Sequence, residues 1–222
     1  AIDSFIHNAK VKKVAIIGSG MIGLEMAENF IARGLEVTIV NRSDKIGPKL
    51  SDLLAERVEE ELLKHGVNIL KEATTAEIFD DYLLMEDGRE VEAEMVLLTT
   101  GVKPNVELAE DAGIELGETG AIKVDLSMQT NIDSIYAAGD CCEQNNIILD
   151  KPTYSPLGTT SNKQGLVAGA NMVGVPFRHS GSLGTGIVKV FDLTIGKIGL
   201  SKKQAEAEGF DPVIIDVDKK SN

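Results

Sequence analysis

The chain has no tryptophan and few aromatic side chains of any kind. Phe and Tyr together make up 4% of its 222 residues, so its core must be built from Ile, Leu, Val and Ala. No apolar run approaches the roughly 20 residues of a membrane span, and we expect neither a span nor a secretory signal. The apolar content of 43% is typical of a soluble globular protein.

Positive charge is scarce as well. Lys and Arg number 22 against 35 Asp and Glu, which gives a net charge of −13. Nucleic-acid backbones are bound by clustered Lys and Arg, so this balance predicts no nucleic-acid partner. The two cysteines, Cys141 and Cys142, are neighbours in the sequence, and neighbouring cysteines rarely form a relaxed disulfide. Their arrangement favours a reducing compartment, and we expect a cytoplasmic protein.

The first third of the chain alternates between expected strands and helices. VAIIG (14–18) is a short apolar run typical of a buried strand, EVTIV (36–40) is rich in β-branched residues, and VNIL (67–70) is a third strand. Helices are predicted over 22–33 and 50–65, where apolar residues recur at helical spacing and a glycine follows the last turn. This order predicts an α/β fold with a Rossmann-type parallel sheet and right-handed crossovers.

The pattern changes after residue 75. Strand-like stretches around Asp87-Gly88 predict an antiparallel hairpin, which returns to the parallel sheet through EMVLL (94–98). GVKPN (101–105) is predicted to be a turn. The remaining expected elements are strands over 121–124, 134–139 and 187–191 and helices over 160–172 and 202–208.

A glycine pattern, G-x-G-x-x-G, lies between the first strand and the first helix. Its first glycine permits a tight turn, the second lets backbone approach a pyrophosphate, and the third lets helix and strand pack closely. Free N–H groups at the start of the following helix favour an anion. We therefore predict a dinucleotide site formed by Gly18, Ser19, Gly20, Met21, Ile22 and Gly23.

The end of the second strand indicates which dinucleotide is bound. An Asp or Glu there usually bonds the ribose 2′-hydroxyl of NAD, but this chain has Asn41, followed by Arg42 and Ser43. Asn does not repel a 2′-phosphate, and Arg42 can pair with one through two N–H groups. The sequence therefore favours NADPH, or tolerance of both coenzymes. The alternative is that Arg42 is a solvated loop residue.

Three motifs in order resemble the flavin-dependent pyridine nucleotide-disulfide oxidoreductases. They are GSGMIGLEMAE (18–28), LLTTGVKPN (97–105) and MQTNIDSIYAAGDC (128–141). The tail over 184–210 is most similar to the branch of coenzyme A-disulfide reductases, NADH oxidases and NADH peroxidases. The resemblance implies a homodimeric flavoprotein that passes a hydride from NAD(P)H to FAD and on to a small-molecule disulfide, a persulfide or oxygen.

The resemblance also assigns roles to individual residues. In this family the glycine turn belongs to the nicotinamide coenzyme, and Glu25 corresponds to the residue that binds its carboxamide. Thr100 and Gly101 correspond to residues that line the same cleft. Asp140, which follows Gly139, corresponds to the residue that bonds the ribityl chain of FAD.

Further expectations concern the flavin side. The helix whose first turn contains Thr159 and Thr160 would direct its positive end at the flavin N1/O2 edge. In the family the redox cysteine lies in an N-terminal flavin segment, so we expect no catalytic residue and no metal site in this chain. Cys141 and Cys142 are expected to be small packed side chains. Met21 replaces an aromatic residue found in many relatives, which puts gating of the nicotinamide pocket in doubt.

The resemblance divides the chain into an NAD(P)-binding domain (1–117), the C-terminal part of an FAD-binding domain (118–179) and the start of an α+β dimerisation domain (180–222). We expect a C-terminal portion of the flavoprotein, inactive alone. One alternative is a non-catalytic NAD(P)-binding module for redox sensing or assembly. Another is an ordinary NAD(P)-dependent dehydrogenase, which would need a general acid or base. That reading is weakened because none of the three histidines has an obvious partner: His7, His65 and His179.

Overall fold

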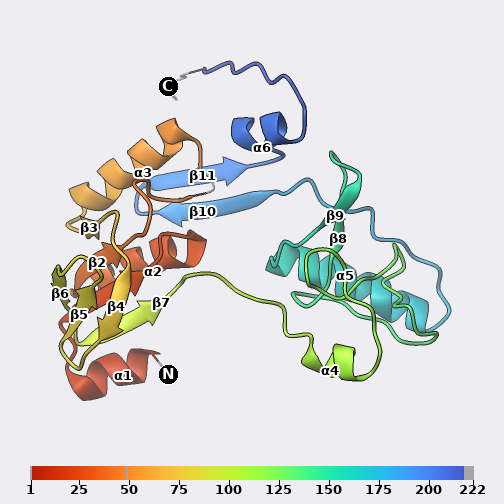
Figure 1. Ribbon diagram of the computed structural model, residues 1–222, viewed down its shortest axis with the longest axis horizontal. Coiled ribbons are helices and arrows are strands. Elements are labelled where there is room, and N and C mark those ends of the chain that lie inside the picture. Colours follow the sequence, from red (N-terminus) through yellow and green to blue (C-terminus); the bar gives the residue numbers. More distant parts are fainter. Residues whose placement is uncertain (1, 49, 218–222) are drawn as a thin grey trace.

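The computed structural model describes residues 2–48 and 50–217 of the chain. Its largest sheet is parallel, with the strand order β3-β2-β1-β7 (Figure 1). Its strands are β1 (Lys13–Ile17), β2 (Glu36–Val40), β3 (Asn68–Leu70) and β7 (Met95–Leu98). The connecting helices are α2 (Met21–Ala32), between β1 and β2, and α3 (Asp52–Lys64), between β2 and β3. The predicted Rossmann-type order of strands and helices is confirmed.

A second, antiparallel sheet is inserted between β3 and β7. Its strands are β4 (Thr75–Ile78), β5 (Tyr82–Met85) and β6 (Glu90–Glu92). The turn between β5 and β6 contains Gly88, whose φ of 85° favours glycine. Arg89 N donates to Asp87 Oδ1 at 3.0 Å across the same turn. The hairpin predicted around Asp87-Gly88 is therefore confirmed.

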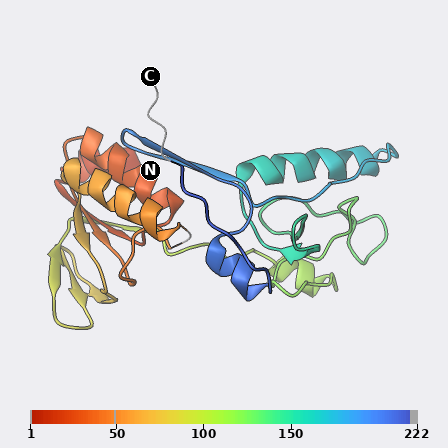
Figure 2. The same cartoon turned by 90° about the horizontal axis from the view of Figure 1, so that it is seen from above.

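Beyond β7 the chain forms a second lobe, which Figures 1 and 2 both show beside the first along the long axis of the molecule. Its elements are α4 (Glu107–Asp111), β8 (Gln144–Asn146), β9 (Lys151–Thr153) and α5 (Gly158–Met172). Helix α5 confirms the helix predicted over 160–172. In the part of the chain that the structure describes, no helix is long and apolar enough to cross a membrane.

Two strands predicted in this lobe are wrong. Ile122 makes only isolated bridges, to Leu116 and Cys142, and Tyr136 makes one to Gln129. A strand is stabilised by a continuous ladder of hydrogen bonds to a neighbour. Over residues 2–48 and 50–217 no segment forms such a ladder with 121–124 or 134–139. The apolar, β-branched composition of these segments was therefore not enough to make strands of them.

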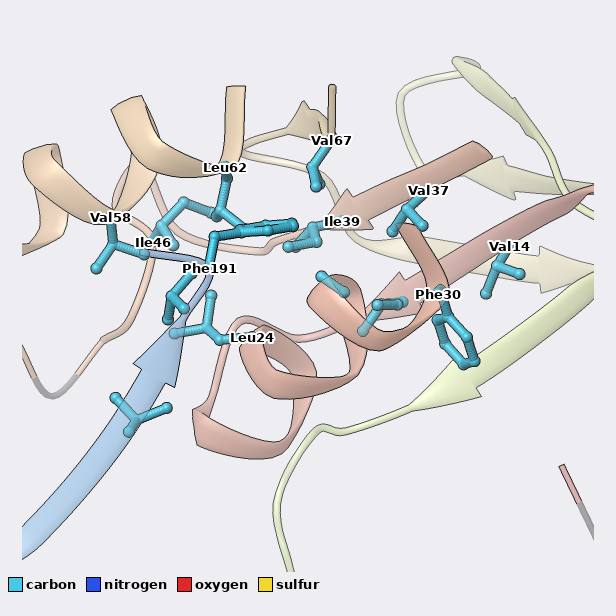
Figure 3. Close-up of a cluster of buried hydrophobic side chains, with 14 of the residues drawn as sticks. Val14, Leu24, Phe30, Val37, Ile39, Ile46, Val58, Leu62, Val67 and Phe191 are labelled. Atoms are coloured by element: carbon cyan, nitrogen blue, oxygen red, sulfur yellow. The ribbon is translucent and has the colours of Figure 1, made fainter. Parts of the chain in front are cut away.

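The chain then returns to the first lobe as an antiparallel hairpin followed by a short helix. These elements are β10 (Gly186–Val190), β11 (Leu193–Lys197) and α6 (Lys202–Ala207). Val188, Val190 and Phe191 are buried in the same hydrophobic cluster as Leu24 of α2 and Leu62 of α3. Figure 3 shows Phe191 among the side chains of these two helices. The hairpin thus completes the core on the helical side of the parallel sheet.

Two carboxylates from the helices hold the tip of this hairpin. Glu28 of α2 accepts from Lys189 Nζ at 2.6 Å and from Phe191 N at 2.8 Å. Glu61 of α3 accepts from Asp192 N at 3.1 Å. The hydrogen bond from Lys189 is the main reason that the pKa of Glu28 is lowered, and the bond from Asp192 N is the main one for Glu61. Both carboxylates thus stabilise the docked hairpin in their charged form.

The stability of the hairpin's attachment should depend on the charge of Glu28. Glu28→Gln removes the ion pair with Lys189, and we expect the free energy of unfolding at neutral pH to fall by about 1 kcal/mol. The pKa of Glu28 is lowered in the folded state. Its contribution to the free energy of unfolding is therefore present above the ordinary glutamate pKa, and it is lost as the pH falls through the lowered pKa. Denaturant titrations of both proteins at several pH values measure this difference.

Glu60→Gln on α3 is the matched control, because the Glu60 side chain is exposed and makes no hydrogen bond or ion pair within the described residues. We expect it to leave the unfolding free energy within about 0.5 kcal/mol of the wild type. A Glu28→Gln variant as stable as this control at neutral pH would contradict the anchoring role.

Candidate nucleotide-binding site

The three glycines of the turn after β1 have different surroundings. Gly18 has a φ of 104°, and a β-carbon there would lie 2.7 Å from Thr99 O. A β-carbon at Gly23 would lie 2.4 Å from Gly18 O. At Gly20 the nearest atom would be Thr99 O at 3.9 Å. The protein's own packing therefore requires glycine at the first and third positions, whereas a β-carbon at the second would make only ordinary contact, so the packing leaves room there.

Helix α2 begins with its N–H groups free for an anion. Its N-cap residue is Gly20, no side chain caps it, and its first turn carries no acidic residue. Met21 and Ile22 are 40% and 58% exposed, and Glu25 is exposed one turn after Met21. Met21 also borders the hairpin, since a β-carbon at Gly186 would lie 3.9 Å from Met21 Cε.

Thr99, which the sequence analysis did not single out, fastens the glycine turn to the end of β7. Its Oγ1 donates toward Ile17 O and Gly18 O at 3.0 and 2.9 Å, and its N–H donates to Ile17 O at 2.9 Å. The next two residues, Thr100 and Gly101, are exposed. The structure therefore brings 100–101 to the same sheet edge as the turn.

The residues at the end of β2 divide into buried and exposed ones. Asn41 is 5% exposed and accepts a hydrogen bond from Ser19 Oγ at 2.8 Å. Ser19 is itself 2% exposed. Arg42 is exposed, with no hydrogen bond or ion pair to another described residue. Of these three predicted residues, Arg42 alone presents its side chain to solvent.

The second lobe places a carboxylate among several hydrogen bonds. Asp140 is exposed and accepts from Ser161 Oγ at 2.5 Å, while its backbone oxygen accepts from Tyr154 OH at 2.8 Å. Gly139 N donates to Gln164 Oε1 at 3.0 Å. Desolvation, and then the Asp140 charge, raise the pKa of Tyr154, so its hydroxyl stays protonated and can donate.

Helix α5 begins beside this carboxylate. Its N-cap residue is Leu157, no side chain caps it, and its first turn carries no acidic residue. Thr159 is exposed, whereas Thr160 is 9% exposed. The bond from Ser161 to Asp140 joins the first turn to the carboxylate, where the positive end of the helix favours negative charge. The free N–H groups of this turn are thus the part of α5 that a ligand can use.

Sequence reasoning missed Ser161, Tyr154 and Gln164. The sequence could have indicated Gln164, because it follows Thr160 by one helical turn and both lie on the buried face of α5. A polar pair on a buried helical face needs partners, and Gln164 meets this need by bonding Gly139 N and Glu143 O. No local pattern marks Ser161 or Tyr154, whose partner Asp140 lies 21 and 14 residues away.

Two hollows on the surface lie away from the glycine turn. One, of about 480 Å³, is lined by residues at the starts of the parallel strands, among them Lys13, Glu36 and Asn68. The other, of about 550 Å³, lies in the second lobe beside Asp125 and His179. Ligands of open α/β sheets bind outside the carboxyl ends of the strands. We therefore assign the candidate site to the glycine turn rather than to either hollow.

Side chains of the types that ligate metals gather at two places, in the second lobe and at the hairpin tip. Cys141 and Cys142 are free thiols whose Sγ atoms lie 3.6 Å apart, and burial raises the pKa of Cys142. Cys142 is 3% exposed in a small apolar cluster, which confirms the expectation of a packed side chain.

The other cluster, at the hairpin tip, consists of Glu61, His65 and Asp192, with ligand atoms close enough to share an ion. Lys64 Nζ lies 3.2 and 3.3 Å from Glu61 Oε2 and Asp192 Oδ2, so the protein supplies its own cation there. His65 Nε2 lies 3.0 Å from Glu61 Oε1. The expectation that no histidine has a partner was therefore wrong for His65, because Glu61 lies one helical turn before it.

The sequence pattern of the pyridine nucleotide-disulphide oxidoreductases matches residues 3–165. The chain belongs to this family. It is 42% identical over 214 residues to the CoA-dependent NAD(P)H sulfur oxidoreductase of Pyrococcus furiosus, covering 95% of this chain and 48% of that protein. It is 31% identical over 218 residues to the coenzyme A disulfide reductase of Staphylococcus aureus, covering 98% and 49%. The expected family and branch are confirmed.

Solved structures of this family have the same fold. The NAD-dependent persulfide reductase of A. fulgidus matches with a TM-score of 0.90 and 38% identity, over 95% of this chain and 40% of that one. A water-forming NADH oxidase of Lactobacillus brevis, bound to NADH, matches with a TM-score of 0.86 and 26% identity, over 94% and 47%. Its engineered NADPH oxidase variant, bound to NADPH, matches equally well. The chain spans about half the length of the curated relatives it matches.

The geometry of the glycine turn leads to a test of where a nucleotide binds. Gly20→Ala adds a methyl group at ordinary contact distance from Thr99 O, so we expect only the small N-cap cost of Ala, and the free energy of unfolding to fall by less than about 1 kcal/mol. The same methyl group would block a pyrophosphate, and we expect NADH and NADPH affinity to fall at least about tenfold. Calorimetric titration and thermal unfolding measure the two effects.

Gly18→Ala is the contrasting variant, because strain and the clash with Thr99 O act on the folded chain itself. We expect it to lower stability by about 1–3 kcal/mol. If Gly20→Ala bound both nucleotides as tightly as the wild type, the pyrophosphate would have to lie elsewhere.

Proposed function

We propose that the chain binds NAD(P)H at the glycine turn and forms one side of an FAD site around Asp140, in a flavoprotein oxidoreductase. The observation that carries this proposal is the glycine turn itself. Packing against Thr99 and Gly18 O fills the space at Gly18 and Gly23, while Gly20 opens onto an uncapped helix. This arrangement fits a dinucleotide pyrophosphate.

The chain's own residues would bind and orient both groups. The first-turn N–H groups of α2 hold the pyrophosphate, Glu25 binds the carboxamide, and Thr100 and Gly101 line the nicotinamide side. Asp140 accepts a hydrogen bond from the ribityl chain, and the start of α5 supplies positive potential to the flavin. When both are bound, NAD(P)H supplies a hydride and FAD accepts it.

The electron acceptor belongs to the same proposal. Named relatives include a CoA-dependent sulfur oxidoreductase, a coenzyme A disulfide reductase and a persulfide reductase. We assign this chain to a homodimeric enzyme that reduces a disulfide, a persulfide or oxygen. Residues 180–222 belong to the start of its dimerisation domain, 118–179 to its FAD-binding domain and 1–117 to its NAD(P)-binding domain.

The end of β2 supports NADPH as a coenzyme. In the engineered oxidase bound to NADPH, three consecutive residues, Asp-Ala-Met, are replaced by Ala-Arg-Ser. Two further residues are replaced there: a Gly that lies 18 residues before the Asp, and a Pro that lies 7 residues after it. Here Gly23 and Pro48 stand 18 before and 7 after Asn41. At the three middle positions the chain has Asn-Arg-Ser, so it shares the Arg-Ser pair of the NADPH-bound variant. It keeps the parent's Gly and Pro.

The proposed reaction is tested under anaerobic conditions on the purified natural protein that contains this chain. We expect the protein to be yellow, and its flavin absorption to bleach when NADPH is added, because a hydride passes to the flavin. Bleaching should reverse on addition of a disulfide, a persulfide or oxygen. A colourless protein that still binds NADPH would instead support a redox-sensing or assembly module, and one that oxidises an alcohol without flavin would support an ordinary dehydrogenase.

Coenzyme choice is tested by removing the exposed guanidinium. Arg42→Ala should weaken NADPH about tenfold and NADH less than about twofold, since only NADPH offers a 2′-phosphate for a charge-assisted pair. Calorimetric titration of each coenzyme measures the ratio. Arg57→Ala, which removes an exposed arginine of α3, should leave both affinities unchanged. Equal loss of NADH and NADPH with Arg42→Ala would remove Arg42 from the 2′-phosphate site.

A further inference from the structure

A buried series of hydrogen bonds joins the glycine turn to the loop over 42–47. Ser19 and Asn41 are 2% and 5% exposed, and Ser19 Oγ lies 2.8 Å from Asn41 Oδ1. Gly47 N donates to Ser19 Oγ at 3.0 Å. The two side chains therefore connect the glycine turn, the end of β2 and the far end of the loop.

The direction of each hydrogen bond follows from counting donors. The Ser19 hydroxyl accepts from Gly47 N–H, and its single proton is left to donate to Asn41 Oδ1. Asn41 Nδ2 then faces Ser43 O at 2.9 Å and Lys45 O at 2.8 Å and donates to both. This is the one amide orientation in which the nitrogen meets carbonyl oxygens and the oxygen meets a hydroxyl.

A carboxylate in place of the amide would weaken this arrangement. Aspartate at position 41 would have no N–H to donate, so its negative charge would face the carbonyl oxygens of Ser43 and Lys45. With only the Ser19 hydroxyl left to donate to it, this buried charge is unfavourable. Both N–H groups of the Asn41 amide thus donate to the loop, and neither is left to bond a ribose.

Arg42 sits within the segment that these bonds hold. Its side chain is exposed and makes no hydrogen bond or ion pair to the rest of the described chain. Asn41 fixes the backbone on one side of it, and the Ser43 carbonyl is held on the other. The direction in which Arg42 points therefore depends on this backbone and not on contacts of its own.

We propose that Ser19 and Asn41 are positioning residues that set coenzyme choice from inside the protein. They hold the 42–47 loop so that Arg42 faces the 2′ position of the bound coenzyme, and neither side chain touches the coenzyme. This inference rests on the proposed NAD(P)H site, and it gives the Asn41 side chain an action through the loop.

A double-mutant cycle tests whether Ser19 acts through Arg42. Ser19→Ala is expected to weaken NADPH about fivefold and NADH less than about twofold. In an Arg42→Ala background the same substitution should change NADPH affinity no further, because there is no guanidinium left to position. Titration of the four proteins with NADPH and NADH measures the coupling. Ile46 is fully buried in the core and anchors the loop independently, so we expect Ser19→Ala to fold.

Asn41→Asp supplies a second test, since it removes the two N–H donors and adds a charge that repels a 2′-phosphate. Its NADPH affinity should fall more than that of Ser19→Ala, and its preference should shift toward NADH. Ser51→Ala is the matched control: Ser51 is exposed at the N-cap of α3 and makes no side-chain capping bond. It should leave both affinities unchanged.

The outcomes separate this inference from the proposed function. Equal weakening of both coenzymes by Ser19→Ala, in both backgrounds, would show a general structural role and overturn the positioning role while leaving the coenzyme site intact. Failure of the wild-type chain to bind either coenzyme would overturn the site and the inference together.

Discussion

The close contact between α2, β1 and β7 is the constraint on which the rest of this structure depends. Gly23 lets α2 lie almost on the carbonyl of Gly18. Thr99, which follows β7, donates a hydrogen bond to the same carbonyl. No side chain larger than hydrogen fits at Gly18 or Gly23 without displacing backbone. This packing directs the first turn of α2 outward from the sheet edge, so one steric requirement fixes the helix against the sheet and leaves its start uncapped.

The buried polar groups near this contact serve the backbone rather than a ligand. Ser19 and Asn41 satisfy each other and the loop over 42–47, while Gln164 does the same for Gly139 in the second lobe. In both places a buried amide holds the backbone segment that presents a charged, exposed neighbour, Arg42 or Asp140. Charged groups at the two candidate sites thus stay hydrated, and rigidity comes from neutral hydrogen bonds beneath them.

The sequence predicted local elements well and long-range partners poorly. The strand over 36–40 has the predicted limits, because its β-branched composition and the preceding Gly34 are local signals. The strands expected over 121–124 and 134–139 did not form, because a strand depends on a neighbour that no local pattern specifies. For the same reason the glycine motif located the turn, while the role of Thr99, 81 residues from Gly18, became visible only in the structure.

The hairpin of β10 and β11 has a mechanical consequence. The chain leaves the first lobe after β7 and re-enters it through β10, so two separate segments span the lobes (Figure 1). A third tie is the ion pair of Lys151 in β9 with Glu208, just after α6. Three ties at separate points of the chain restrict how far the two lobes can shift relative to one another. The same ties therefore limit any change in the separation of Gly20 and Asp140.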